Sequence, residues 1–169
     1  MKMVMLVDGY NVIHKFPCLK NLLKRSVYQA QAKLISLVSN YCSAEKMEGY
    51  LIFDAYRRPS SDIEEEMSPE LKVVLTGKGK TADSYIEKFI FQRKFFYDYI
   101  YVVTSDYSQR MTVADKKVLF ISPENFLEKL KTCQKDLAGK YSSTFPESHP
   151  KLSDYLEEEV RKKLEDMRR

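Results

Sequence analysis

The fold of this 169-residue chain is decided by one stretch near its start, Met3-Val4-Met5-Leu6-Val7-Asp8-Gly9-Tyr10-Asn11. An apolar run stops there on Asp8, and two later runs, residues 50–53 and 99–105, stop on Asp54 and Asp106. Continuous runs of apolar, β-branched and aromatic residues are typical of strands buried on both faces, as in a parallel sheet. The sequence therefore predicts a parallel sheet whose strands end on carboxylates.

Those carboxylates indicate where the chemistry takes place. In open parallel sheets, ligands bind beyond the carboxyl ends of the strands, so Asp8, Asp54 and Asp106 are expected at one edge. A fourth acid, Asp83, opens an amphipathic segment at residues 81–87, and the whole chain has only two histidines. Carboxylate oxygens without histidine favour a hard cation such as Mg²⁺ or Mn²⁺. The pattern predicts a metal-dependent acidic active site.

Strand and helix patterns alternate along the rest of the chain. Between and after the strands we expect a turn region at 9–17, a helical pattern at 22–41, an acidic loop at 57–69 and a helix capped by Thr81. A short helix at 108–113 and a helix starting at Pro123 follow. The expected strands are residues 3–7, 49–53, 71–75, 99–104 and 117–121. This alternation predicts a three-layer α/β fold with right-handed crossovers.

Composition divides the chain into three parts. Residues 1–138 form the expected globular domain, and residues 139–150, rich in Ser, Thr, Pro and His, indicate a surface linker. Residues 151–169 carry apolar residues at helical spacing between charges, which predicts a C-terminal amphipathic helix. The net charge of +4 permits a nucleic-acid partner without requiring one.

The cysteines and apolar runs indicate the compartment. Three cysteines without paired spacing exclude a zinc ribbon and a disulfide framework, and they favour a reducing environment. No run approaches the roughly 20 apolar residues that span a bilayer, and Asp8 interrupts the first run too early for a signal peptide. We expect a cytoplasmic protein without a membrane partner; its oligomeric state stays open.

Each acid also has an alternative structural explanation. Asp8 and Asp54 can cap the turn or helix that follows, and Thr104 or Ser105 can orient a ligand or cap a helix near Asp106. Asp83 and Glu87 lie one helical turn apart on a common face, but Glu87 can instead pair with a neighbouring cation, Lys88 or Arg93.

Basic residues in the predicted loops around this edge are candidates to hold RNA phosphates, which position a strand without reading its sequence. The alternative is an ordinary solvated surface. These residues are Arg57, Arg58, Lys78, Lys80 and Arg110.

Other chemistries fit the sequence poorly. A haloacid-dehalogenase-like phosphatase needs a second aspartate two residues after the first, where this chain has Tyr10. The glycines at 77–79 lack Walker-loop spacing. A metal-free ribonuclease needs two histidines as acid and base, and the pair here is His14 and His149, placed in a loop and in the linker.

Four ordered motifs resemble a known family, and they extend the match from about residue 3 to residue 130. They are Leu-Val-Asp-Gly-Tyr-Asn-Val-Ile at 6–13, Phe-Asp-Ala at 53–55, Thr-Ala-Asp-Ser-Tyr-Ile-Glu at 81–87 and Val-Thr-Ser-Asp-Tyr at 103–107. Together they resemble the YacP-like branch of the NYN domains, within the PIN-like nuclease superfamily. The resemblance implies a PIN-like α/β fold and a Mg²⁺- or Mn²⁺-dependent endoribonuclease. Bacterial members are described as ribosome-associated enzymes that cut messenger RNA in the ribosomal A site.

The resemblance also implies roles for individual residues. By motif, Asp8, Asp83 and Asp106 form the catalytic, metal-holding cluster, with Asp54 and Glu87 as further candidate ligands. Asn11 and Ser105 would support the site from the strand ends. Residues 114–118, Ala-Asp-Lys-Lys-Val, stand where family members usually carry a glycine-rich stretch, so local RNA or ribosome contacts differ there.

The predicted function is a metal-dependent endoribonuclease that cleaves mRNA in a ribosome-dependent way. Two alternatives stay open: a catalytically idle RNA- or ribosome-binding adaptor on the same fold, and a metal-dependent phosphatase. Clustered acids facing phosphate argue against a pure binder, because negative charge repels the ligand.

Overall fold

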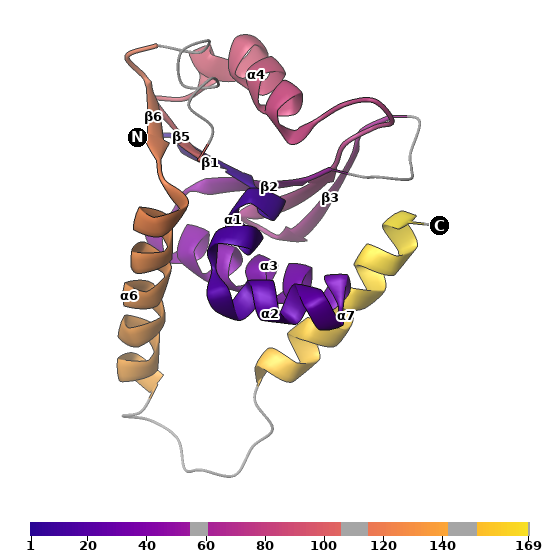
Figure 1. Ribbon diagram of the computed structural model, residues 1–169. Helices are drawn as coiled ribbons and strands as arrows, with labels where there is room; N and C mark the ends of the chain where they lie inside the picture. Colours follow the sequence, from indigo (N-terminus) through magenta and orange to yellow (C-terminus); the bar gives the residue numbers. More distant parts are fainter. Residues whose placement is uncertain (55–60, 106–114, 142–151, 169) are drawn as a thin grey trace.

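The computed structural model describes residues 1–54, 61–105, 115–141 and 152–168. Within them, six strands form one sheet in the order β3-β4-β2-β1-β5-β6 (Figure 1). The strands are β1 (Met3–Asp8), β2 (Glu48–Phe53), β3 (Ile63–Ser68), β4 (Leu71–Leu75), β5 (Tyr99–Val103) and β6 (Val118–Ile121). The five predicted strands are confirmed, with bounds that differ by at most one residue.

Five of these strands are parallel, and β3 is an antiparallel edge strand. The expected loop at 57–69 was wrong in part, because residues 63–68 pair with β4 along its outer side. An edge strand tolerates the run Glu64-Glu65-Glu66, since part of its surface remains in water. Ile63 and Met67 contact the core and hold the strand in place.

The helices on the first half of the chain begin earlier than the periodicity indicated. They are α1 (Gly9–Lys15), α2 (Pro17–Arg25) and α3 (Val27–Glu45), so the expected turn region at 9–17 is helical and the pattern at 22–41 spans two helices. Phe16 and Ser26 have extended backbones, and each separates two helices. Pro17 starts α2 and the Ser26 hydroxyl caps α3, so two short-range signals set where these helices begin.

The remaining helices agree with the sequence at their starts. They are α4 (Ala82–Arg93), the 3₁₀ turn η1 (Lys94–Phe96), α6 (Pro123–Tyr141) and α7 (Leu152–Arg168). Thr81 caps α4 and Pro123 opens α6, as predicted. The expected helix at 108–113 lies outside the described residues. None of the helices that the structure describes combines the length and apolar character needed to cross a membrane.

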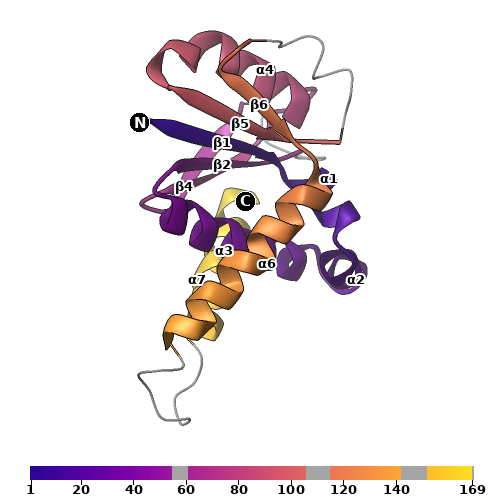
Figure 2. The ribbon, with the colours of Figure 1, turned by 90° about the vertical axis from the view of Figure 1, so that its left-hand side faces the viewer.

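The sheet separates two hydrophobic cores. Helix α4 covers one face, where Ile86 and Phe89 pack on Val102, and α1, α2, α3, α6 and α7 lie on the other (Figures 1 and 2). Leu34 and Phe126 are fully buried on that second face. The predicted three-layer α/β fold, with a mainly parallel sheet flanked by helices, is confirmed.

The C-terminal helix is part of the second core. Leu164 of α7 is fully buried and Met167 is nearly so, and α7 packs along α3. Its Lys163 Nζ also donates a hydrogen bond to the carbonyl oxygen of Glu66 on β3, at 3.3 Å. The helix therefore contacts the edge of the sheet as well as the helical layer.

The strand order reverses beside β1. The chain places β2 and then β4 on one side of β1, crosses the sheet through α4, and places β5 and β6 on the other side. The order therefore reverses between β1 and β5, which is the position where ligands bind in open α/β sheets.

Candidate active site

Asp8 stands at the carboxyl end of β1 and begins α1. Its carboxylate oxygen Oδ1 accepts a hydrogen bond from the backbone N–H of Asn11, at 3.1 Å, which makes it the N-cap of α1. Asp8 therefore has the capping role that was the structural alternative to metal binding, and its Oδ1 makes this capping bond. The side chain is half-buried, so it lies at the boundary between sheet and solvent.

The residue after Asp8 must be small. A Cβ atom on Gly9 would lie 2.3 Å from Cε1 of Phe53, the last residue of β2. The Tyr10 ring then packs edge-on against the same Phe53 ring, with centroids 5.3 Å apart. This close packing holds the Asp8 turn against the end of β2, next to Asp54.

A side-chain hydrogen bond joins the segments that follow β1 and β5. The amide Nδ2 of Asn11 donates to Oγ of Ser105 at 2.9 Å, joining α1 to the residue that precedes Asp106. The other amide atom, Oδ1 of Asn11, is buried and accepts no hydrogen bond from the residues that the structure describes. Asn11 and Ser105 thus meet at the switch point, while Asp106 itself lies outside the described residues.

Asp54 ties the end of β2 to the start of α4. Its Oδ1 accepts a hydrogen bond from the backbone N–H of Ala82, the first residue of that helix. Thr81 and Ser84 complete the start with a reciprocal capping box, at 3.2 and 3.0 Å. Asp83 follows Ala82 directly, and its Oδ1 is buried. Asp54 therefore brings Asp83 to the same end of the sheet as Asp8.

Glu87 lies one turn further along α4 and is half-buried. Of its two suggested partners, Arg93 instead donates to the hydroxyl of Tyr50, at 3.1 Å, and places its guanidinium over the Phe89 ring. Among the residues described, Glu87 forms no ion pair. The pairing suggested as its structural role is thus not observed there.

The donors at this edge are oxygens. Asp8, Asp54 and Asp83 come from three different elements, and carboxylate oxygens of this kind suit a hard divalent cation. Within the described part of the chain, no three His, Cys, Asp or Glu side chains lie close enough together to hold a metal ion. Asp106, the remaining acid of the motifs, lies outside that part.

The loop after β4 is fixed by an acid that the sequence analysis left inside the acidic loop. Oδ1 of Asp62 accepts the backbone N–H of Gly77 at 2.7 Å, and Oδ2 pairs with Lys80 Nζ at 3.1 Å. Burial alone would raise the pKa of Asp62, but these bonds from Gly77 and Lys80 hold it below its ordinary value. The hairpin pattern at 63–75 was the signal that would have placed Asp62 beside this loop.

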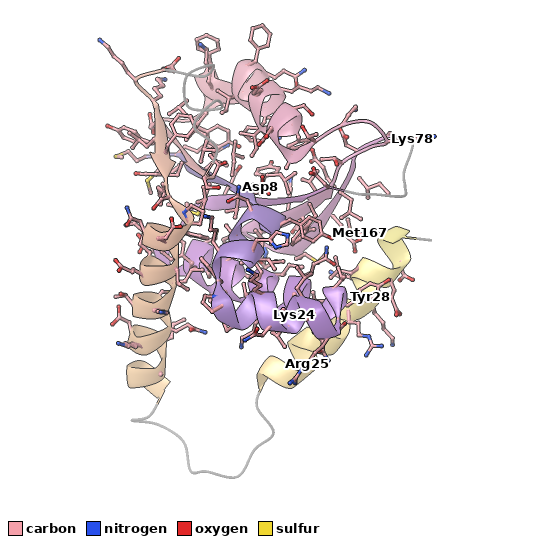
Figure 3. All side chains as sticks on the ribbon, viewed as in Figure 1. Asp8, Lys24, Arg25, Tyr28, Lys78 and Met167 are labelled. Carbon is pink, nitrogen blue, oxygen red and sulfur yellow. The ribbon has the colours of Figure 1, made fainter. Side chains whose placement is uncertain are left out.

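The candidate RNA-binding residues fall into three groups. Lys80 is paired with Asp62, as above, and Lys78 is exposed at the tip of the same loop. Figure 3 shows Lys78 beyond the sheet, on the side to which α4 belongs, with Asp8 nearer the centre of the molecule. Arg57, Arg58 and Arg110 lie outside the described residues.

Similarity to known proteins agrees with this arrangement. The model of the YacP-like NYN domain matches residues 5–169, nearly the whole chain. The chain belongs to the YacP-like NYN domain family. Among curated proteins, it is 29% identical to the protein YacP of Bacillus subtilis (strain 168), over 98% of this chain and 96% of the relative.

Solved structures give the same result. The crystal structure of Rae1 (YacP) from Bacillus subtilis superposes with a TM-score of 0.70 at 26% identity, covering 98% of this chain and 94% of that one. Its W164L mutant superposes with the same TM-score and identity, over 97% of this chain and 99% of that one. The predicted family is thus confirmed, and membership in an NYN, PIN-like family supports a nuclease.

Proposed function

We propose that this protein is a Mg²⁺- or Mn²⁺-dependent endoribonuclease that cleaves messenger RNA on the ribosome. The observation that carries the proposal is the junction at the switch point. The Asn11–Ser105 hydrogen bond joins the ends of β1 and β5, and the Asp54–Ala82 bond places Asp83 at the same edge. These contacts support a cluster of Asp8, Asp54 and Asp83, and the sequence adds Asp106 directly after Ser105.

Asp8, Asp83 and Asp106 would hold the cation, with Asp54 and Glu87 nearby. When bound, such an ion activates water and stabilises negative charge on a phosphate. Asn11 keeps the ends of β1 and β5 at a set separation, and Asp54 orients the first turn of α4. The proposed reaction breaks the bond between phosphorus and the 3′ oxygen, which leaves a 5′ phosphate and a 3′ hydroxyl.

The test of the nuclease compares three substitutions on one RNA. Asp8→Asn and Asp106→Asn should each abolish Mn²⁺-dependent cleavage, while Glu124→Gln, an exposed acid on α6, should leave it intact. In EDTA, the Asp8→Asn and Asp106→Asn proteins should melt at or above the temperature of the wild type, because removing one of several like charges relieves repulsion. Cleavage that persists in Asp8→Asn and Asp106→Asn would contradict the proposal.

The metal has a readout that does not depend on cleavage. Mn²⁺ at about 100 times its Kd should stabilise the fold by about 2.7 kcal/mol, because the ion binds the native state. Asp106→Asn should show much less of this stabilisation. An equal shift in wild type and variant would place the ion elsewhere. A parallel assay on a generic phosphomonoester separates a nuclease from a phosphatase.

Ribosome dependence is the part of the proposal that rests on family resemblance. A net charge of +4 is small, and RNA affinity depends mainly on neutralised phosphates, so free RNA should be held weakly and salt should release it. We expect far more efficient cleavage of a transcript in a translation extract than in the same extract with an initiation inhibitor. Equal cleavage in both would leave a general endoribonuclease.

A further inference from the structure

The first three helices are unusual in charge. Residues 9–44 contain no Asp or Glu, although the whole chain has 24 acidic residues among 169. Acids resume only at Glu45, the last residue of α3. The same stretch carries five cations: Lys15, Lys20, Lys24, Arg25 and Lys33. Surfaces of soluble proteins normally mix both signs, so a stretch of one sign indicates a charged ligand.

Most of these cations point into solvent. Helix α2 buries Leu19 and partly buries Leu22 and Leu23, which leaves its opposite face to water. Lys15, Lys20, Lys24 and Arg25 are all exposed, and we call these four residues the α2 basic surface. None of the four forms an ion pair with another residue in the described ranges. Their charge is therefore not neutralised there.

The α2 basic surface lies on the same side of the molecule as the candidate active site. Helix α1 starts directly after Asp8, and Phe16 alone separates it from α2. In Figure 2, β1 runs toward α1 and α2, so both helices lie toward the carboxyl end of the strands. Figure 3 places Lys24 and Arg25 on the side of Asp8 where α1, α2 and α3 lie, and Lys78 on the side where α4 lies. Cations thus flank the acidic edge on both sides.

Cations beside the carboxylates are needed if an RNA strand is to approach them. A polyanionic strand that approaches Asp8 and Asp83 is repelled unless cations beside them neutralise its phosphates. A positive last turn also complements the helix dipole, which accounts for Lys15 on α1 and for Lys24 and Arg25 on α2 but leaves Lys20 unexplained. The exposed cations thus extend over more of the surface than a helix end requires.

We infer that the α2 basic surface binds the phosphate backbone of the single-stranded RNA substrate and directs it across α1 to Asp8. This inference rests on the proposed nuclease function and adds the path of the strand. The contact is to phosphates, so it positions the RNA without selecting a sequence.

The experiment measures RNA affinity without cleavage. A fluorescently labelled 12-nucleotide single-stranded RNA is titrated with the full chain in EDTA, at several salt concentrations. The test variant is the triple Lys20→Gln, Lys24→Gln, Arg25→Gln. The matched control is Lys129→Gln, Lys131→Gln, Lys135→Gln, which removes the same charge from exposed positions on α6.

The test variant should bind at least about 10-fold more weakly at low salt, because each phosphate contact adds about 0.7 to the salt slope of single-strand binding. Its slope should be shallower by about 2, the sum for three lost contacts. The control should keep the slope of the wild type. With Mn²⁺ present, the test variant should show a raised KM for the same RNA and an unchanged kcat.

Several results would overturn the inference. Equal affinity and slope in test and control variants would show that the α2 basic surface does not contact the strand, even if cleavage by the wild type is intact. Loss of ribosome binding alone, with unchanged binding of the 12-mer, would assign the surface to ribosomal RNA or protein. Competition by poly-glutamate as strong as that by RNA would indicate an acidic protein ligand. If the triple variant melts early, Lys20→Glu alone repeats the test.

Failure of the nuclease proposal gives a different pattern. In that case the Asp8→Asn protein would cleave like the wild type, or neither would cleave, whereas the binding titration in EDTA would be unaffected. The two proposals therefore fail in separate measurements.

Discussion

Glu48, at the amino end of β2, contacts side chains, whereas Asp8 and Asp54, at the carboxyl ends of β1 and β2, each accept a hydrogen bond from a backbone N–H. Glu48 accepts a hydrogen bond from the Tyr97 hydroxyl at 2.6 Å and pairs with Lys2 at 3.3 Å. Asp8 and Asp54, at the other end, accept from the N–H groups of Asn11 and Ala82.

The difference separates structural acids from candidate catalytic ones. A cationic partner neutralises a carboxylate, as Lys2 does for Glu48. A backbone N–H fixes the position of a carboxylate oxygen without supplying a full positive charge. Glu48 is therefore suited to hold the fold together, and Asp8 and Asp54 are suited to contact a cation.

The largest expected effect compares one acid from each end. Asp83→Asn should lower cleavage by at least about 100-fold, the scale of losing a preorganised charged group in a site. Glu48→Gln should change cleavage little and lower the melting temperature, because it weakens the contacts to Tyr97 and Lys2. Cleavage rates and thermal melting of the two purified variants test this. Equal losses of activity would remove the distinction between the ends.

Two glycines test the packing at each end. Gly9→Ala places a Cβ against Phe53, and Gly49→Ala places one 2.6 Å from the Cys42 sulfur. Each should destabilise the fold by about 1–3 kcal/mol, the usual range for overpacking. Only Gly9→Ala should also slow cleavage at temperatures where both variants are folded, because Phe53 precedes Asp54. Urea denaturation and activity assays measure the two effects.

Gly139→Ala on α6 is the matched control, since nothing lies within 4 Å of its added Cβ. It should leave activity near the wild type and raise stability by about 0.5–1 kcal/mol, because Ala is favoured over Gly inside a helix. Slow cleavage by Gly49→Ala as well would show that strain passes through the whole sheet.

Alkaline pH should weaken the amino end. Burial, with a smaller contribution from Glu70, raises the pKa of Cys42 from 9.0 to about 12. Because the folded pKa is the higher one, this contribution to stability is complete below pH 9 and is lost as pH rises toward 12. The loss is about 1.4 kcal/mol per pH unit for one group. Urea denaturation at pH 7, 9 and 10 measures it.

Cys42→Ala should be less stable than the wild type at pH 7, because it removes a buried side chain. Its stability should then fall less between pH 9 and pH 10. An identical fall in both proteins would assign the alkaline loss to other groups, such as Tyr41, whose pKa burial and Glu45 raise to about 12.

Acidic pH should weaken the contacts of Asp62 at the carboxyl end, and this is the smallest of the four predicted effects. The pKa of Asp62 is lowered in the folded state, so its contribution is complete above pH 3.8, its ordinary value, and is lost as pH falls below it. Asp62→Asn should cost about 1 kcal/mol at pH 7, and the difference from wild type should shrink below pH 4. Lys80→Gln should reproduce part of this loss, and Lys78→Gln should not. A constant difference across the pH range would contradict the assignment.

Local patterns predicted much of the fold. The runs that stop on Asp8, Asp54 and Asp106 correctly indicated three parallel strands, and Thr81 and Pro123 correctly marked two helix starts. These signals depend on a few neighbouring residues, which is why they can be read without the fold. The antiparallel edge strand β3 was missed, because its acidic residues are acceptable only where part of a strand remains in water.

The sequence motifs named candidate residues for the site but not the contacts between them. The sequence motifs include Asn11, Asp54 and Ser105, but each of these residues has a hydrogen-bond partner that is distant in sequence. Ser105 is 94 residues from Asn11, and Ala82 is 28 residues from Asp54. No short pattern contains such a pair. Asp62 was overlooked as a positioning residue for the same reason.

The sequence by itself determined the five parallel strands, the acids that follow them and where α4 and α6 begin, because periodicity and capping act over a few residues. Tertiary structure alone decided the strand order, the edge strand β3 and the tie from Asp54 to α4. It also decided that the acid-free helices α1 and α2 lie toward the active-site edge. Those features depend on which distant segments pack together, and many alternative pairings have the same local pattern.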